Sequence, residues 1–341
     1  MDRATRKQIT VWLWTCCALI FLMVVVGGVT RLTHSGLSVT EWRPLVGAVP
    51  PLDEAQWTEL FQKYQQTPEY QKINRAMTLE EFRGIFWWEY FHRLLGRVIA
   101  LAFLLPFLYF LARKKIDPPR ARHFALIFAL GGLQGALGWL LVRSGLIDEP
   151  HVSPYRLAAH LGLAFAIYGA ILRTALQLRS PGLAAPHTHF HRSRVLAAAL
   201  AGLIFLMVLS GALVAGTRAG FVYNTFPLMD GRWLPPDAFS IAPWYRNFFE
   251  NAATVQFDHR VTALVLVIAI TSFWWHLVRG RAPRRVRWAG SLLVAAAALQ
   301  VTLGITTLLY LVPLPLAAAH QAGALLLFTA AVFLHQELER A

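Results

Sequence analysis

The sequence predicts an all-α integral membrane protein with eight transmembrane helices, arranged as two pseudo-twofold-related four-helix bundles. Composition is the first reason: 56% of the 341 residues are hydrophobic and only 15% are charged, whereas about 25% of residues in soluble domains are charged. The second reason is that basic residues gather in alternate loops. The third is that one set of motifs occurs twice, in the same order, in the two halves of the chain.

Long uncharged runs locate the helices. Four of them are long enough to cross a hydrocarbon core of about 30 Å: 11–30, 124–142, 195–217 and 288–316. The hydropathy of the whole chain gives eight expected helices, at about 11–30, 86–111, 123–143, 156–178, 193–216, 253–278, 287–309 and 315–335. The two cysteines, Cys16 and Cys17, are adjacent within the first run and are expected to be packed core residues.

The distribution of charge predicts the topology. Basic residues cluster in the segments 1–7, 113–122, 179–194 and 279–287, where the only acidic residues are Asp2 and Asp117. This is the positive-inside pattern, and it places these segments and both termini in the cytoplasm. The net charge of +14 is therefore attributed to topology, and nucleic acid is not expected as a partner. A multi-pass protein of the bacterial inner membrane is expected.

The repeated motifs predict a duplicated unit. Three segments have a counterpart: Glu89–Arg93 in Gln256–Arg260, Leu133–Gly138 in Leu299–Gly304, and Ala158–His160 in Ala318–His320. The duplication divides the chain into an N-terminal half at 1–178, a cytoplasmic linker at 179–192 and a C-terminal half at 193–341. Both halves start on the same side, so the pseudo-twofold axis would lie along the membrane normal.

The two longest outer loops, 31–85 and 217–252, are rich in aromatic residues. Disordered segments are poor in aromatics, so we expect each loop to form an ordered cap on the outer membrane surface. Arg31 and Arg218 lie at matched positions where these loops begin.

Each half contains a pair of histidines within apolar sequence, His92 with His160 and His259 with His320. Counted from the expected helix starts, all four lie about 6–9 Å below the outer face. Two imidazoles from facing helices at one depth are what bis-histidine ligation of haem iron requires. The alternative is that these histidines hydrogen-bond neighbouring helices. A zinc site is disfavoured, because no third ligand recurs.

Charged residues accompany these histidines. Arg93 and Arg260 directly follow the first histidine of each pair, and with Arg31 and Arg218 they could bind haem propionates or extend to lipid headgroups. Glu89 lies three residues before His92, on the same helix face. It could act as a proton acceptor or charge stabiliser, or form an ion pair with Arg93 or Arg97. Its counterpart is Gln256, so the first half is predicted to be the reactive one.

Two further motifs are not expected to bind haem. Gln134-x-x-x-Gly138 and Gln300-x-x-x-Gly304 place small residues on one helix face and are expected to serve close helix packing. His187-x-His189-x-His191 lies in the linker and is expected to be solvated.

The chain resembles the haem A synthases, the COX15/CtaA family. The stretches that resemble it are Gly27–Thr33 with Ser35–Ser38, Trp42-x-Pro44, Phe82–Arg97, Gly211–Gly216 and Asn224–Met229. The long 31–85 loop resembles the proteobacterial and mitochondrial branch. Some members have a cysteine pair in the first outer loop, and this chain has none there.

The resemblance implies a reaction and its sites. It implies oxidation of the C8 methyl group of haem O to a formyl group through a hydroxymethyl intermediate, supplying haem A to a terminal oxidase. It implies that His92 and His160 line the substrate site, that His259 and His320 ligate a haem b cofactor, and that Glu89 takes part in catalysis. Whether the oxygen comes from O₂ or water stays open.

Two other functions remain as alternatives. A di-haem b membrane electron carrier or quinol-oxidising subunit would explain the paired histidines but not the single carboxylate. A transporter would explain the repeat, but would place its polar residues near mid-membrane. Expected partners are haem O, haem O synthase, terminal oxidase assembly factors, an unidentified electron donor, membrane lipid and, in a homo-oligomer, further copies of the chain.

Overall fold

The structure is a computed structural model that describes residues 1–41, 46–147, 150–179 and 190–341. The Trp42-x-Pro44 motif and most of the 179–192 linker, with His187 and His189, lie outside the described residues. Within them, eight helices are long and apolar enough to span a membrane. They are α1 (Arg3–Leu32), α4 (Leu79–Ala112), α5 (Pro118–Ser144), α6 (Pro154–Arg179), α7 (His191–Gly216), α9 (Ala252–Arg279), α10 (Arg284–Leu309) and α11 (Leu314–Glu339). The predicted all-α membrane fold is confirmed.

The helices begin earlier than hydropathy indicates, because capping residues lie outside the apolar run. Asp2 caps α1 by accepting a hydrogen bond from the Thr5 amide. α4 starts at Leu79, seven residues before the expected 86, and Thr78 with Glu81 forms a capping box there. The expected start of this helix was wrong, so the depth of His92 cannot be counted from the first residue of α4.

The pattern of helix neighbours is the same in both halves. α1 packs against α4 and α6, and α5 packs against α6 and α4. α7 packs against α9 and α11, and α10 packs against α11 and α9. The halves meet where α6 contacts α7 and α11 and where α1 contacts α11. Two units related by a twofold axis would give this pattern, although the axis itself stays a prediction.

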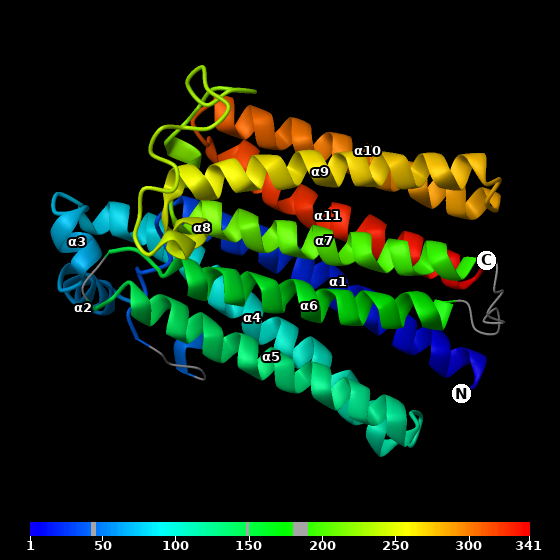
Figure 1. Ribbon diagram of the computed structural model, residues 1–341. Helices are drawn as coiled ribbons and strands as arrows, with labels where there is room; N and C mark the ends of the chain where they lie inside the picture. The colour runs from blue at the N-terminus through cyan, green and yellow to red at the C-terminus, as the bar shows by residue number, and fades with distance from the viewer. Residues whose placement is uncertain (42–45, 148–149, 180–189) are drawn as a thin grey trace.

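Short helices form a cap at the end of the bundle opposite both termini (Figure 1). The 31–85 loop contains η1 (Val46–Ala48), α2 (Glu54–Gln65) and α3 (Pro68–Lys72), and the 217–252 loop contains η3 (Ala219–Phe221), η4 (Trp244–Arg246) and α8 (Asn247–Glu250). An aromatic cluster joins α2 to the first turns of α4: Trp57, Tyr64, Phe82, Phe86 and Tyr90. The expected ordered, aromatic cap is confirmed for the described residues.

At the opposite end, α1 and α4 are joined around a proline. Pro106 lies inside α4 and cannot donate to the carbonyl of Ala102, four residues earlier. The indole Nε1 of Trp12 donates to that carbonyl instead, at 2.9 Å. The Trp12 ring packs on Phe103 and Phe124 with centroids 5.0 and 5.2 Å away. The buried Cys16 and Cys17 of the next turn are packed as expected.

One helix differs clearly from its counterpart. α5 has fewer neighbouring residues on α6 and α4 than α10 has on α11 and α9, and α5 diverges from the bundle in Figure 1. A methyl group added at Gly131, Gly132 or Gly135 would meet no atom within 4 Å. The repeat places Ala297 opposite Gly131, and Ala297 is buried. The duplicated unit is therefore packed less tightly in the first half.

Candidate functional site

The first histidine of each pair packs against a glycine on a neighbouring helix. His92 is on α4, and a methyl group added at Gly27 of α1 would stand 3.1 Å from its Nε2. His259 is on α9, and a methyl group added at Gly211 of α7 would stand 3.4 Å from its Cε1. α1 and α7 are matched helices, so the two contacts are counterparts.

The second histidine of each pair has the same arrangement. A methyl group at Gly138 of α5 would stand 3.1 Å from Cε1 of His160, and one at Gly304 of α10 would stand 2.9 Å from Cε1 of His320. Separations this short are tighter than ordinary van der Waals contact. These two glycines therefore lie at contacts between neighbouring helices, as their spacing predicts, and the side chain that they leave room for is an imidazole.

The histidines form one pair in each half. His92 lies close enough to His160, and His320 lies close enough to His259, for their charged forms to repel each other. All four imidazoles are half-buried although they lie within the helix bundle. The structure thus brings the predicted partners together, and their role as iron ligands stays a prediction.

The ring nitrogens allow a test of whether haem iron fits these pairs. Ser210 Oγ lies 3.1 Å from His259 Nδ1. Among the described residues, the Nδ1 atoms of His160 and His320 are buried without a hydrogen-bond partner. Iron ligation through one ring nitrogen is compatible with a hydrogen bond at the other, and neutral imidazole is the metal-binding form. The residues present therefore fit a bis-histidine group in each half.

Glu89 of α4 is a buried acid, with 3% of its surface exposed. Its Oε1 accepts a hydrogen bond from Arg93 Nε at 2.5 Å. The other nitrogens of Arg93 donate to the backbone carbonyls of Glu41, at 2.8 Å, and Val39, at 2.6 Å. Arg93 therefore fixes the carboxylate and also ties the first outer loop to α4.

The second half contains the same network without the acid. Arg260 donates to Gln256 Oε1 at 3.2 Å. It also donates to the carbonyls of Tyr223 and Thr225 in the second outer loop, each at 2.9 Å. The two networks differ in the side chain that lies four residues before the arginine. It is the carboxylate of Glu89 in the first half and the amide of Gln256 in the second.

The remaining pair of predicted arginines lies where the two halves meet. Arg31 donates to the carbonyl of Ala215 on α7, and it interacts electrostatically with Arg218. Like charges placed together are unfavourable, and Glu69 of the cap supplies an opposite charge near Arg218 only in its ionised form. A bound dianion would offset the repulsion further, so these two arginines fit propionate binding better than Arg93 and Arg260 do.

Sequence reasoning missed the contact between the two histidine sites. Gln321 follows His320, and its Nε2 donates to the carbonyl of Val24 on α1 at 2.7 Å. A methyl group at Gly28 would stand 2.5 Å from Gln321 Oε1. Gly27 and Gly28 therefore serve both sites, one touching His92 and the other touching the residue after His320. The sequence feature that could have indicated this contact is the pair of adjacent glycines near the end of the first apolar run.

The cap contains a second buried acid that sequence reasoning did not identify. Glu69 of α3 has 3% of its surface exposed and accepts a hydrogen bond from the Tyr64 hydroxyl at 3.3 Å. Burial raises its pKa to about 7, while Tyr64 and Arg218 act in the opposite direction. A glutamate in an aromatic-rich loop has no sequence signal that distinguishes it from a solvated one.

Comparisons with known proteins find relatives over nearly the whole chain. A profile of the COX15-CtaA family, described as a cytochrome oxidase assembly protein, matches residues 10–332. A relative from Nitrosospira multiformis named "Heme A synthase" is 59% identical over 338 residues, which cover 99% of this chain and 95% of the relative. Relatives with the same name from Nitrosomonas eutropha and Parvibaculum lavamentivorans are 54% and 47% identical, covering 99% and 97% of this chain and 96% and 94% of the relatives.

Proposed function

Because the chain belongs to the COX15–CtaA family of cytochrome oxidase assembly proteins, we propose that it is a haem A synthase, a membrane oxidoreductase. It oxidises the C8 methyl group of haem O to a formyl group through a hydroxymethyl intermediate, and the product supplies a terminal oxidase. The observation that carries this proposal is the unequal pair of networks. Arg93 binds a buried carboxylate where Arg260 binds an amide, so the network of the first half contains a group suited to proton transfer and the matched network of the second half does not.

The two histidine pairs have different roles in this proposal. His92 and His160 hold the substrate haem O, and His259 and His320 hold a haem b cofactor. Haem b bound there would supply one-electron redox chemistry. The glycine contacts support a haem at each pair, because all four imidazoles pack against a glycine of a neighbouring helix.

Glu89 is the catalytic acid–base group. Each of the two successive two-electron oxidations removes one hydrogen from the carbon of the C8 methyl group, and a carboxylate three residues from His92 is suited to accept a proton or stabilise developing positive charge. Arg93 binds Oε1, which fixes the plane of the carboxylate and leaves Oε2 for the substrate. Arg93 is therefore a positioning residue as well as an anchor for the loop.

We assign propionate binding to two pairs of arginines, which differ in how many of their N–H groups are already used. Arg31 and Arg218 are adjacent cations at the boundary between the halves, and their charges suit carboxylates directly. Arg93 and Arg260 each use several N–H groups on loop carbonyls. A guanidinium has five N–H groups, so each of these two retains donors for a propionate.

We also propose an orientation of the protein in the membrane. Both termini lie at the basic end of the bundle, which the positive-inside rule assigns to the cytoplasm of a bacterial inner membrane. The capped end, with both histidine pairs, then lies toward the periplasm. Haem O synthase and terminal oxidase assembly factors are the proposed partners for delivery and release, together with an electron donor.

Co-expression with a source of haem O tests the proposal. Haems extracted from the membranes should contain haem A when the intact chain is present. Glu89→Gln should lower haem A formation by about 100-fold or more, the usual scale of acid–base catalysis, without loss of bound haem. The matched control is Glu80→Gln on the same helix, because the Glu80 side chain is exposed and its removal should leave the yield unchanged.

Histidine variants separate this function from the alternative of an electron carrier. His92→Ala should abolish haem A formation while the low-spin spectrum of the His259–His320 site remains. Haem bound at both pairs, with no haem A from the intact protein under co-expression, would overturn the synthase and favour the electron carrier.

A further inference from the structure

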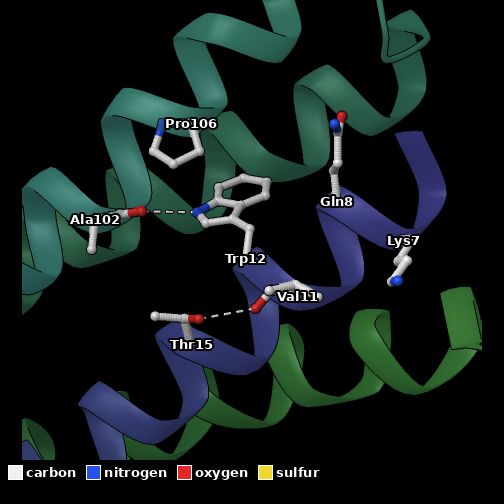
Figure 2. A pocket seen from close by; sticks show the side chains of 7 residues that line it. All are labelled: Lys7, Gln8, Val11, Trp12, Thr15, Ala102 and Pro106. Carbon is white, nitrogen blue, oxygen red and sulfur yellow. Dashed lines mark hydrogen bonds between the residues drawn. The ribbon is translucent and has the colours of Figure 1, made fainter. Parts of the chain in front are cut away.

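An apolar groove lies between α1 and α4 at the end of the bundle that contains the termini. It has a volume of about 550 Å³ and is lined by Lys7, Gln8, Val11, Trp12, Thr15, Ala102 and Pro106. Figure 2 shows Trp12 between the two helices, Ala102 and Pro106 on the α4 side, and Lys7 and Gln8 toward one end. Neither histidine pair takes part in this groove, so it is separate from the proposed active site.

The Trp12 ring forms the floor of the groove, beside Pro106 of α4. The Trp12 indole fills the space next to Pro106 and donates to the Ala102 carbonyl at 2.9 Å. It also packs against Phe103 and Phe110, with centroids 5.0 and 5.6 Å away. Trp12 is buried, whereas Val11 is 57% exposed. The floor is therefore rigid, and the outer wall is open to the surroundings of the helix bundle.

The end of the groove is basic. Lys7 lies at this end, and Lys115 donates to Gln8 Oε1 at 3.2 Å from the segment that follows α4. Two acids line a neighbouring pocket together with Lys115, and both have other partners: Asp2 caps α1 by accepting from the Thr5 amide, and Asp117 pairs with Arg120. The Lys115 ammonium thus lies beside Gln8, and Lys7 of the preceding position on α1 also lines this end of the groove.

We propose that this groove binds an anionic phospholipid. One acyl chain lies along Val11, Trp12 and Thr15, and the phosphate contacts Lys7 and Lys115. The stretch from Lys7 to Thr15 rises by about 12 Å, which is most of the depth of one leaflet of a hydrocarbon core about 30 Å thick. Basic pockets between transmembrane helices on the cytoplasmic side recognise anionic headgroups.

The basic residues at the end of the groove favour a phospholipid over the other apolar chain that could lie there. The isoprenoid tail of a haem substrate could lie against Val11 and Trp12, but it carries no group that would use Lys7. A phospholipid satisfies both the apolar wall and the basic end. It would also join α1 to α4 through contacts with both, at the place where Pro106 has removed a backbone hydrogen bond.

Lipid titration of the purified full chain tests the proposal. Native mass spectrometry would compare phosphatidylglycerol with phosphatidylcholine of the same acyl chains. The wild type should retain one phosphatidylglycerol in preference to phosphatidylcholine. Lys7→Gln should weaken phosphatidylglycerol binding about fivefold, since one basic residue near an anionic surface contributes on the order of 1 kcal/mol. Phosphatidylcholine binding should not change.

Two further variants complete the design. Ala102→Phe places a ring in the groove and should reduce binding of both lipids, whereas Arg122→Gln removes an exposed charge at the same membrane face and should change neither. Equal binding of the two lipids by the wild type, or no effect of Lys7→Gln, would overturn the proposal. Displacement of phosphatidylglycerol by haem O but not by protohaem would assign the groove to the substrate's tail instead.

Discussion

At the scale of single residues, four glycines determine how closely four imidazoles approach the neighbouring helices. The sequence predicts the histidine pairs, because a polar ring repeated in apolar sequence is unusual. It does not predict what the glycines contact, since a small residue on a transmembrane helix usually serves helix packing. Only the three-dimensional arrangement shows that Gly304 faces His320 rather than a backbone.

Replacing one of these glycines should disturb one site only. In Gly304→Ala the new methyl group would stand 2.9 Å from His320 Cε1, so the imidazole must move. We expect haem affinity in the second half to fall by about 10–100-fold, the usual cost of disturbing the surroundings of a metal ligand. Haem content and the low-spin spectrum of the purified protein measure this effect.

Gly202→Ala is the matched control on α7, because a methyl group there meets nothing within 4 Å. It should keep full haem content and should not destabilise the helix, since alanine favours helix more than glycine does. Equal haem content in Gly304→Ala and Gly202→Ala would contradict the proposed role of Gly304.

Glu69 should make the stability of the cap depend on pH. Its pKa of about 7 in the folded protein lies above the ordinary 4.5, so folding favours the protonated acid. The stabilisation is fully present below about pH 4.5 and is lost as the pH rises through 7, with an upper limit of about 3 kcal/mol. Proteolysis of the 31–85 loop should therefore be faster at pH 8 than at pH 5.

Glu69→Gln should remove this dependence, because the amide does not titrate. Glu59→Gln on α2 serves as the control, since the Glu59 side chain is 62% exposed, and it should keep the dependence. A Glu69→Gln protein whose proteolysis still accelerates between pH 5 and pH 8 would show that another group is responsible.

At the scale of helices and loops, the arginine after each first histidine connects a transmembrane helix to its outer loop. The sequence predicts the helices themselves, because long apolar runs leave few alternatives in a bilayer. It misplaces the start of α4 by seven residues, since the additional turns are stabilised by the Thr78 capping box and by aromatic contacts with α2. Neither contribution appears in a hydropathy profile.

Arg260→Leu should release the second outer loop. The variant loses charge-assisted hydrogen bonds to the carbonyls of Tyr223 and Thr225, each of which contributes about 1.5–3 kcal/mol. Limited proteolysis within 217–252 should accelerate by at least about tenfold. Arg246→Gln removes an exposed pair with Glu250, worth about 1 kcal/mol or less, and should have little effect.

At the scale of the whole molecule, the two halves have the same helix neighbours but unequal packing. The repeat predicts the first property, because matched motifs in the same order imply matched helices. It does not predict the second, because packing depends on many small substitutions, such as Gly131 in one half and Ala297 in the other. The inequality agrees with the proposed function, in which the first half exchanges a substrate haem and the second half retains a cofactor.

The loose packing of α5 has a consequence for local unfolding. A helix with few tertiary contacts opens with a lower free energy than the rest of the fold, and its amides exchange with solvent sooner. Amides around Gly131–Gly135 should therefore exchange with deuterium at least about tenfold faster than those around Ala297–Val301, a difference of about 1.4 kcal/mol. Equal protection of the two segments in the same membrane mimetic would show that the lighter contacts of α5 do not lower its stability.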